Sequence, residues 1–154
     1  MANTYSQIYF QVVFAVKFRH NLLQKPWRDE VFKYMSGIIT EKGQKAIIVN
    51  GVSDHVHLFI GLKPSISLSD LVRDVKNNSS NLINDMKLTR GKFAWQGGFG
   101  AFSYAPSAIN NVYNYILNQE SHHKKTLFKL EFLDLLQQFE IEYNDKYLFD
   151  WLDA

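Results

Sequence analysis

The strongest constraint on the fold of this chain is the spacing of its apolar residues, which changes from segment to segment along 154 positions. Residues 5–18 place apolar side chains on one side at a period of two, which is typical of a strand. After Pro26, apolar residues recur every three or four positions until Gly43, which predicts a helix. Residues 45–53 and 55–62 are again strand-like, and the short turn between them indicates a hairpin.

The second half of the chain carries more helical spacing than the first. Ser67 and Asp70 have the form of a capping box ahead of a long helix that ends before Gly91. The elements expected after it are a glycine-rich loop, a short strand and two helices, over residues 95–100, 101–104, 106–123 and 127–139. Together these elements predict an α+β fold of the ferredoxin-like sandwich kind, with an antiparallel sheet covered on one face by helices.

The net charge of +2 is the sum of two opposite regions. Residues 1–129 contain sixteen Lys and Arg against eight Asp and Glu, whereas residues 130–154 contain one against seven. We therefore expect a single domain over residues 1–154, with a basic body suited to a nucleic-acid partner and an acidic C-terminal tail over residues 130–154.

Cysteine is absent from the chain, which excludes disulfide scaffolds, thiol nucleophiles and Cys-ligated zinc. Any metal must therefore use His, carboxylate or amide ligands. No run approaches the roughly 18 apolar residues of a membrane span, and the N-terminal apolar run lacks the basic lead of a signal peptide. We expect a cytoplasmic protein with no membrane partner.

Two histidines stand two positions apart in the strand expected over residues 55–62. Residues two apart on a strand face the same side, so His55 and His57 project together while Val56 and Leu58 face the core. Two imidazoles placed in this way can share a metal ion, or they can be polar residues on an exposed sheet face. A catalytic metal also needs at least one further protein ligand.

The first of the two expected C-terminal helices carries a tyrosine away from its apolar stripe. Tyr113 falls within the stripe that faces the core, whereas Tyr115 lies roughly 110° from the centre of that stripe. Tyr115 is therefore either a boundary aromatic or a phenol presented by a rigid helix, with the Gln119 amide one turn away and able to reach a metal. His122 and His123 could extend a metal cluster, but we interpret them as the exposed, positively charged end of this helix.

Three segments of the chain together resemble one known family. They are Asp54-His55-Val56-His57-Leu58, the loop and strand from Trp95 to Ser103, and the helical segment from Tyr115 to His123. In this order they are similar to the IS200/IS605 transposases, which are single-tyrosine members of the HUH (His-hydrophobic-His) endonucleases. The resemblance runs over almost the whole chain, and it implies a ferredoxin-like fold with a C-terminal tyrosine-bearing helix.

The resemblance implies roles for four residues. The metal-binding histidine pair of the family falls on His55 and His57, its nucleophilic tyrosine on Tyr115, and its third metal ligand on Gln119. The implied enzyme is a DNA transposase and single-strand endonuclease whose tyrosine attacks a phosphodiester, forms a 5′-phosphotyrosine and frees a 3′-hydroxyl for strand transfer. The implied cofactor is Mg²⁺ or Mn²⁺. The implied partners are single-stranded DNA hairpins in a bacterial or archaeal nucleoid, and a second copy of the chain in a homodimer that can share active sites.

Basic residues interleaved with aromatics suit single-stranded DNA, because phosphate contacts and base stacking then act together. Arg73 and Lys76 stand three apart on the second expected helix and can face one groove. The alternative is an ordinary solvated helix face. The residues expected to bind DNA are Lys17, Arg19, Arg73, Lys76, Arg90, Lys92 and Trp95.

Three other functions stay open at this point. A domesticated relative would cleave repeated genomic hairpins without moving its own element. A non-catalytic nucleic-acid-binding module would need neither Tyr115 nor metal, although the aromatic submotif of RNA-recognition domains is missing. A two-histidine phosphoesterase would need two His-x-Thr/Ser motifs, whereas this chain has one His-x-His.

Overall fold

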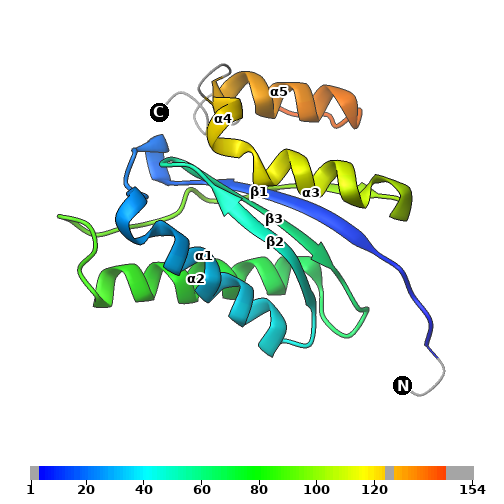
Figure 1. Ribbon diagram of the computed structural model, residues 1–154, viewed down its shortest axis with the longest axis horizontal. Coiled ribbons are helices and arrows are strands. Elements are labelled where there is room, and N and C mark those ends of the chain that lie inside the picture. Colours follow the sequence, from blue (N-terminus) through cyan, green and yellow to red (C-terminus); the bar gives the residue numbers. More distant parts are fainter. Residues whose placement is uncertain (1–3, 124–126, 145–154) are drawn as a thin grey trace.

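A four-stranded sheet with helices packed on it forms the body of the protein (Figure 1). The computed structural model describes residues 4–123 and 127–144, without the side chain of Arg19. Among the helices of this described part, none has the length and apolar character needed to cross a membrane. The elements in chain order are β1 (Tyr9–Ala15), η1 (Lys17–Arg19), α1 (Lys25–Glu41), β2 (Lys45–Gly51), β3 (His55–Gly61), α2 (Leu68–Asp85), β4 (Gly100–Tyr104), η2 (Pro106–Ala108), α3 (Ile109–Leu117), α4 (Gln119–His123) and α5 (Phe128–Gln138).

The strands lie in the order β2-β3-β1-β4, and every neighbouring pair is antiparallel. In the central strand β1, Val13 pairs with His57 of β3 on one side and with Gly100 of β4 on the other. The expected hairpin of β2 and β3 is confirmed, and Gly51 stands at its tight turn, where a Cβ would collide with the backbone of His55. The predicted α+β fold with an antiparallel sheet is therefore confirmed.

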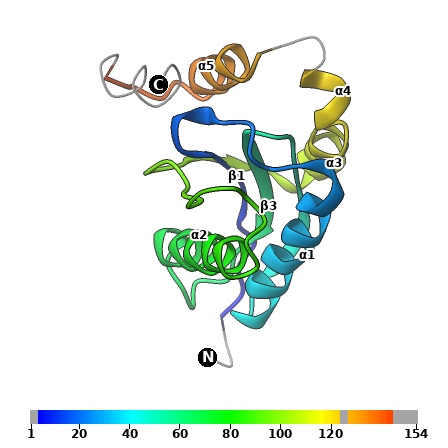
Figure 2. The ribbon, with the colours of Figure 1, turned by 90° about the vertical axis from the view of Figure 1, so that its left-hand side faces the viewer.

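Helices cover both faces of the sheet, so the expectation of a single covered face is wrong. Figure 2 shows α2 and α5 on opposite sides of the strands. On one face, α1 and α2 pack on apolar residues that include Val12 and Leu58. On the other face, α5 packs on Val13 and α3 packs on Phe59. Because β1 and β3 carry apolar residues on both sides, a second helical layer is needed to bury them.

The helix expected over residues 106–123 is broken. Asn118 leaves helical geometry, with φ −96° and ψ 20°, and separates α3 from α4, which runs in a different direction (Figure 1). Val112 and Ile116 fill the core beneath α3. Tyr113 is 38% exposed, so the prediction that it is a core residue is wrong. The reason is that the buried stripe of α3 is narrow and centred on Val112 and Ile116.

Part of the segment expected as an acidic tail is folded as α5. Its apolar side chains Phe132, Leu135 and Leu136 are buried against the sheet. Leu135 and Leu136 follow Phe132 by three and four residues, so the three side chains form one apolar stripe on the helix. Residues 145–154 of the expected tail lie outside the described residues. The fold therefore uses the beginning of this segment to cover β1 and β4.

Candidate metal and nucleophile site

His55 and His57 lie on β3, with their rings toward the face that α3, α4 and α5 cover. Neither side chain has accessible surface, and Val56 and Leu58 face the opposite core. The prediction that the two histidines share a face is confirmed. The alternative of an exposed sheet face is wrong because α5 covers it, and the ring of Phe128 stacks on His55 at a centroid distance of 4.1 Å.

Both ring nitrogens of His55 have neighbours. Nδ1 lies 2.7 Å from Asp54 Oδ1, while Nε2 lies 3.3 Å from Gln119 Oε1 and 3.4 Å from Glu131 Oε1. Burial alone would lower the pKa of His55, but the two carboxylates outweigh it and raise the pKa to about 9. Asp54 fixes the orientation of the ring, and with Nδ1–H donating to it, Nε2 is the nitrogen that faces the site.

The Nδ1 side of the His57 ring faces polar residues of β1 and β4. Its Nδ1 is 3.0 Å from Gln11 Nε2, and Gln11 Oε1 accepts a hydrogen bond of 2.8 Å from the Tyr104 hydroxyl. Its Nε2 lies 3.2 Å from Glu131 Oε1. Burial lowers the pKa of His57, so the neutral imidazole, which is the metal-binding form, is favoured.

Tyr115 and Gln119 reach the same place from α3 and α4. The ring of Tyr115 is half-buried and lies edge-on to His57, at a centroid distance of 5.9 Å. Gln119 is fully buried, and its Nε2 donates to Glu131 Oε2 at 3.1 Å. Burial first, and then the charge of Glu131, raise the pKa of the Tyr115 phenol. The structure therefore brings together all four residues that the resemblance singled out, within one chain.

Glu131 of α5 is the residue that sequence reasoning missed, and it is the centre of the site. Its side chain is 2% exposed. Its Oε2 accepts hydrogen bonds from the Tyr115 hydroxyl and from Gln119. Burial would raise the pKa of Glu131, but hydrogen bonds from His123, His55 and His57 outweigh burial and hold the pKa well below its usual range. The sequence does contain a signal for the role of Glu131, because a carboxylate on the apolar stripe of a helix needs a buried partner.

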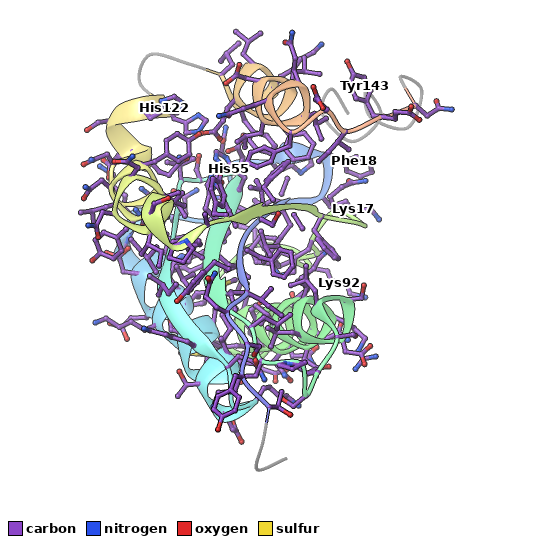
Figure 3. The ribbon with its side chains drawn as sticks, turned by 90° about the vertical axis from the view of Figure 1, so that its right-hand side faces the viewer. Lys17, Phe18, His55, Lys92, His122 and Tyr143 are labelled. Atoms are coloured by element: carbon purple, nitrogen blue, oxygen red, sulfur yellow. The ribbon has the colours of Figure 1, made fainter. Side chains whose placement is uncertain are left out.

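His122 and His123 also face this carboxylate, so their interpretation as an exposed helix end is wrong. His123 Nε2 lies 3.1 Å from Glu131 Oε1. His122 Nε2 is 3.2 Å from Glu131 Oε2, but the angles do not make a hydrogen bond, and this buried nitrogen has no hydrogen-bond partner among the described residues. Figure 3 shows His122 on α4 and His55 on the sheet, both on the side of the molecule that α5 covers.

The donor set of this cluster fits a divalent cation. The ligand atoms of His55, His57, His123 and Glu131 all lie within 4.8 Å of one another. Imidazole nitrogen suits ions such as Zn²⁺ and Ni²⁺, whereas carboxylate and carbonyl oxygen suit Mg²⁺ and Mn²⁺. The amide oxygen of Gln119 adds a further ligand atom beside His55. The cluster can therefore hold a metal ion next to a phenol.

The family model described as "Transposase IS200 like" matches residues 4–119, about three quarters of the chain. The matched part contains the sheet, the histidine pair, Tyr115 and Gln119. The chain belongs to the IS200-like transposase family. His122, His123 and α5 lie beyond the matched residues.

Relatives of this IS200-like transposase agree with that assignment. The ISDra2 transposase TnpA of Deinococcus radiodurans is 27% identical over 74 residues, which cover 48% of this chain and 53% of that protein. The chain thus spans about half the length of this curated relative. A candidate transposase from D. radiodurans R1, solved by crystallography, superimposes with a TM-score of 0.61 at 20% identity, covering 76% of this chain and 94% of that one. A REP-associated tyrosine transposase bound to a REP hairpin gives a TM-score of 0.59 at 13% identity, covering 79% and 72%.

Two residues expected to bind DNA in this IS200-like transposase instead fasten the glycine-rich loop to α2. Lys76 Nζ donates to the carbonyl oxygens of Gln96 and Gly98, at 2.7 and 2.9 Å, and its partial burial lowers its pKa. Trp95 is 9% exposed, and its Nε1 donates to Ser79 Oγ at 3.0 Å. Trp95 is therefore a core aromatic rather than a stacking surface, because Phe14 of β1, Phe93 and α2 surround it.

The other residues expected to bind DNA include several exposed cations. Arg73 is exposed and forms ion pairs of 3.2 Å with Asp70 and Asp74 of its own helix. Lys17 and Lys92 stand along one edge of the view in Figure 3. The exposed cations of this group are Lys17, Arg73, Arg90 and Lys92, and the side chain of Arg19 lies outside the described part.

Proposed function

We propose that this chain is a metal-dependent single-stranded DNA transposase in which Tyr115 attacks a phosphodiester next to a DNA hairpin. The observation that carries the proposal is the meeting of Tyr115, His57 and Gln119 around one buried carboxylate within a single chain. Membership of the IS200-like transposases supports DNA transposition as the reaction class. The metal is Mg²⁺ or Mn²⁺, and the residues that hold it are His55, His57 and Gln119.

The reaction needs one bond exchange at phosphorus. The Tyr115 hydroxyl oxygen forms a bond to phosphorus while the bond from phosphorus to O3′ of the preceding nucleotide breaks. The phenolic proton leaves Tyr115, and the departing oxygen takes up a proton to become a 3′-hydroxyl. The resulting 5′-phosphotyrosine retains the energy of the broken bond, so attack by another 3′-hydroxyl completes strand transfer and regenerates Tyr115.

The acidity of the phenol is the obstacle to this step. Ionising a phenol with a pKa near 10 at pH 7.5 costs roughly 3.4 kcal/mol. The pKa of Tyr115 is raised above that ordinary value by burial and by Glu131, so the cost here is larger. His55, His57 and Gln119 would hold a divalent cation, which would polarise the scissile phosphate and stabilise charge on the departing oxygen, a contribution of several kcal/mol. Because the imidazoles and the amide assigned to the metal are neutral ligands, they leave its charge available to the phosphate.

Hairpin DNA and a second copy of the chain are the partners in this proposal. The structural neighbour bound to a REP hairpin supports a hairpin substrate, and the exposed cations of this chain supply phosphate contacts. The resemblance to IS200/IS605 transposases favours a homodimer. Since Tyr115 already lies beside His57 of its own chain, a dimer that exchanged α3 would repeat the same contacts between subunits.

Adduct formation on DNA tests the proposal directly. The protein is incubated with single-stranded DNA from the flanks of its own gene, with Mg²⁺ or Mn²⁺, and a protein–DNA adduct is sought on a denaturing gel. Tyr115→Phe should abolish the adduct and cleavage but keep hairpin binding. Tyr113→Phe is the matched control, because it removes an exposed hydroxyl two positions away. Cleavage by Tyr115→Phe at the normal rate would remove Tyr115 from the mechanism.

A further inference from the structure

We propose that Glu131 is itself a metal ligand through Oε1, and that His123 completes the set, so that the cation is bound by three imidazoles, one carboxylate and the amide oxygen of Gln119. The proposal rests on the metal dependence proposed above and adds two ligands to it. Both residues lie beyond residues 4–119, which match the family model. Helices α4 and α5, which carry His123 and Glu131, would then both supply ligands to the metal centre.

The spacing around Glu131 Oε1 is that of atoms that share one ion. Ligand atoms about 2.1 Å from a cation and at right angles to one another are about 3 Å apart. Glu131 Oε1 lies 3.1 Å from His123 Nε2, 3.2 Å from His57 Nε2 and 3.4 Å from His55 Nε2. The three imidazoles come from two different elements, β3 and α4, yet all direct their Nε2 atoms at the same oxygen.

The two oxygens of Glu131 face different groups. Oε1 faces the three imidazole nitrogens, whereas Oε2 accepts hydrogen bonds from the Tyr115 hydroxyl and Gln119 Nε2. One carboxylate therefore links the metal side of the site to the nucleophile. Through Oε2, Glu131 is a positioning residue for Tyr115, and through Oε1 it is a ligand.

This donor set changes the expected metal preference. Three imidazoles favour Mn²⁺, Co²⁺ or Zn²⁺ over Mg²⁺, because Mg²⁺ prefers oxygen ligands and keeps several waters. The carboxylate also removes part of the positive charge that two histidines and an amide would leave on the ion. We therefore expect tighter binding of Mn²⁺ than of Mg²⁺.

Metal titration of the full chain without DNA tests the proposal. Mn²⁺ binding is followed through the electron paramagnetic resonance signal of the free ion. Glu131→Gln should weaken Mn²⁺ binding by roughly tenfold to a hundredfold or more, which is at least the loss seen when a group that only supports a ligand is removed. Asp134→Asn is the matched control, because it removes the same charge from an exposed position on the same helix. It should bind Mn²⁺ as the unaltered protein does.

A second variant covers the case in which Glu131→Gln does not fold. His123→Gln leaves the carboxylate in place and should also weaken Mn²⁺ binding. In the Co²⁺-loaded protein, it should change the visible absorption bands, which report the ligands of the ion. Unchanged bands and unchanged Mn²⁺ affinity in this variant would remove His123 from the set.

The variants separate this inference from the proposed function. If His57→Ala loses Mn²⁺ binding while Glu131→Gln keeps it, the added ligand is wrong and the histidine site stands. If Glu131→Gln binds Mn²⁺ more tightly, the carboxylate competes with the metal, which overturns the inference. An equal loss in Asp134→Asn would also overturn it, since the effect would then be one of net charge. Unchanged Mn²⁺ binding by His57→Ala would overturn both proposals.

Discussion

Tyr115 and Glu131, sixteen positions apart and on different helices, are joined by a hydrogen bond from the tyrosine hydroxyl to Glu131 Oε2. This contact ties α3 to α5 across the face of the sheet that carries His57. The position of the phenol therefore depends on a helix that lies beyond the part of the chain matching the family model. Variants of α5 should affect the active site as well as stability.

The carboxylate of Glu131 should make the metal-free protein sensitive to acid. The pKa of Glu131 is held well below the ordinary value of 4.5, so its stabilising contribution is present above about pH 4.5 and is lost as the pH falls below it. Breaking such a buried ion pair costs about 3 kcal/mol. In the presence of EDTA, Glu131→Gln should lower the free energy of unfolding by about that amount at pH 7, and by clearly less at pH 3.5. Urea unfolding at both pH values measures the difference, and a gap that stays constant with pH would contradict the assignment.

Gln11 should control metal affinity without touching the metal. Its amide nitrogen lies 3.0 Å from His57 Nδ1, and its oxygen accepts from the hydroxyl of Tyr104, whose pKa is raised to about 12 by burial, so that the phenol stays protonated. When Nε2 of His57 binds a metal, Nδ1 carries the proton, so the Gln11 amide must turn its oxygen toward Nδ1 and accept from it. Groups that orient a ligand histidine typically change metal affinity by roughly tenfold to a hundredfold. Gln11→Leu should weaken Mn²⁺ binding by that factor, and Tyr104→Phe by less. Gln7→Leu, at an exposed position before β1, is the control, and equal Mn²⁺ affinity in Gln11→Leu would contradict the role.

The sheet and the histidine pair could be predicted because their signals are local. The period-two pattern of residues 55–62 places His55 and His57 on one face whatever the rest of the chain does. The break between α3 and α4 could not be predicted, because nothing in the apolar spacing around Asn118 marks a change of direction. The exposure of Tyr113 depends on how narrow the buried stripe of α3 is, which only packing against Phe59 decides.

Glu131 could not be placed because its contacts are distant in sequence. It lies 74 positions from His57, and within the helix expected over residues 127–139 it counts only as part of the acidic C-terminal tail. The apolar residues around it, Phe128, Phe132 and Leu135, were the signal that this segment is buried. Likewise, the cation of Lys76 suggested DNA, because a sequence does not reveal that two loop carbonyls stand within its reach.

Lys76 should be more important for stability than its neighbour Arg73. Its ammonium group joins α2 to the carbonyls of Gln96 and Gly98, so Lys76→Met leaves two acceptors without their charged donor. We expect a loss of about 1–3 kcal/mol in the free energy of unfolding. Arg73→Met removes only exposed ion pairs, which are worth about 0–1 kcal/mol. Urea unfolding of the two variants checks this order, and equal losses would show that Lys76 does not hold the loop.

Phe18 should lower the stability of the fold and strengthen the binding of single-stranded DNA. It is 47% exposed and adopts the left-handed conformation, with φ 59° and ψ 15°, and Lys17 Nζ lies 5.4 Å from its ring centroid. A bulky residue in this region is strained by roughly 1–2 kcal/mol, which glycine avoids. Strained residues tend to occur at functional sites. Because Phe18 is exposed and lies beside a cation, this strain favours a role in stacking on an unpaired base.

Phe18→Gly should therefore raise the free energy of unfolding by about 1 kcal/mol while weakening single-stranded DNA binding by roughly tenfold, the loss expected for one stacked base. Phe18→Tyr should keep the affinity, because it keeps the ring. Tyr34→Ala, which removes an exposed aromatic from α1, is the control for nonspecific effects of losing a surface ring. Fluorescence anisotropy with a labelled oligonucleotide measures binding. Undiminished affinity in Phe18→Gly would show that the strained turn serves the fold alone and presents no base-stacking surface.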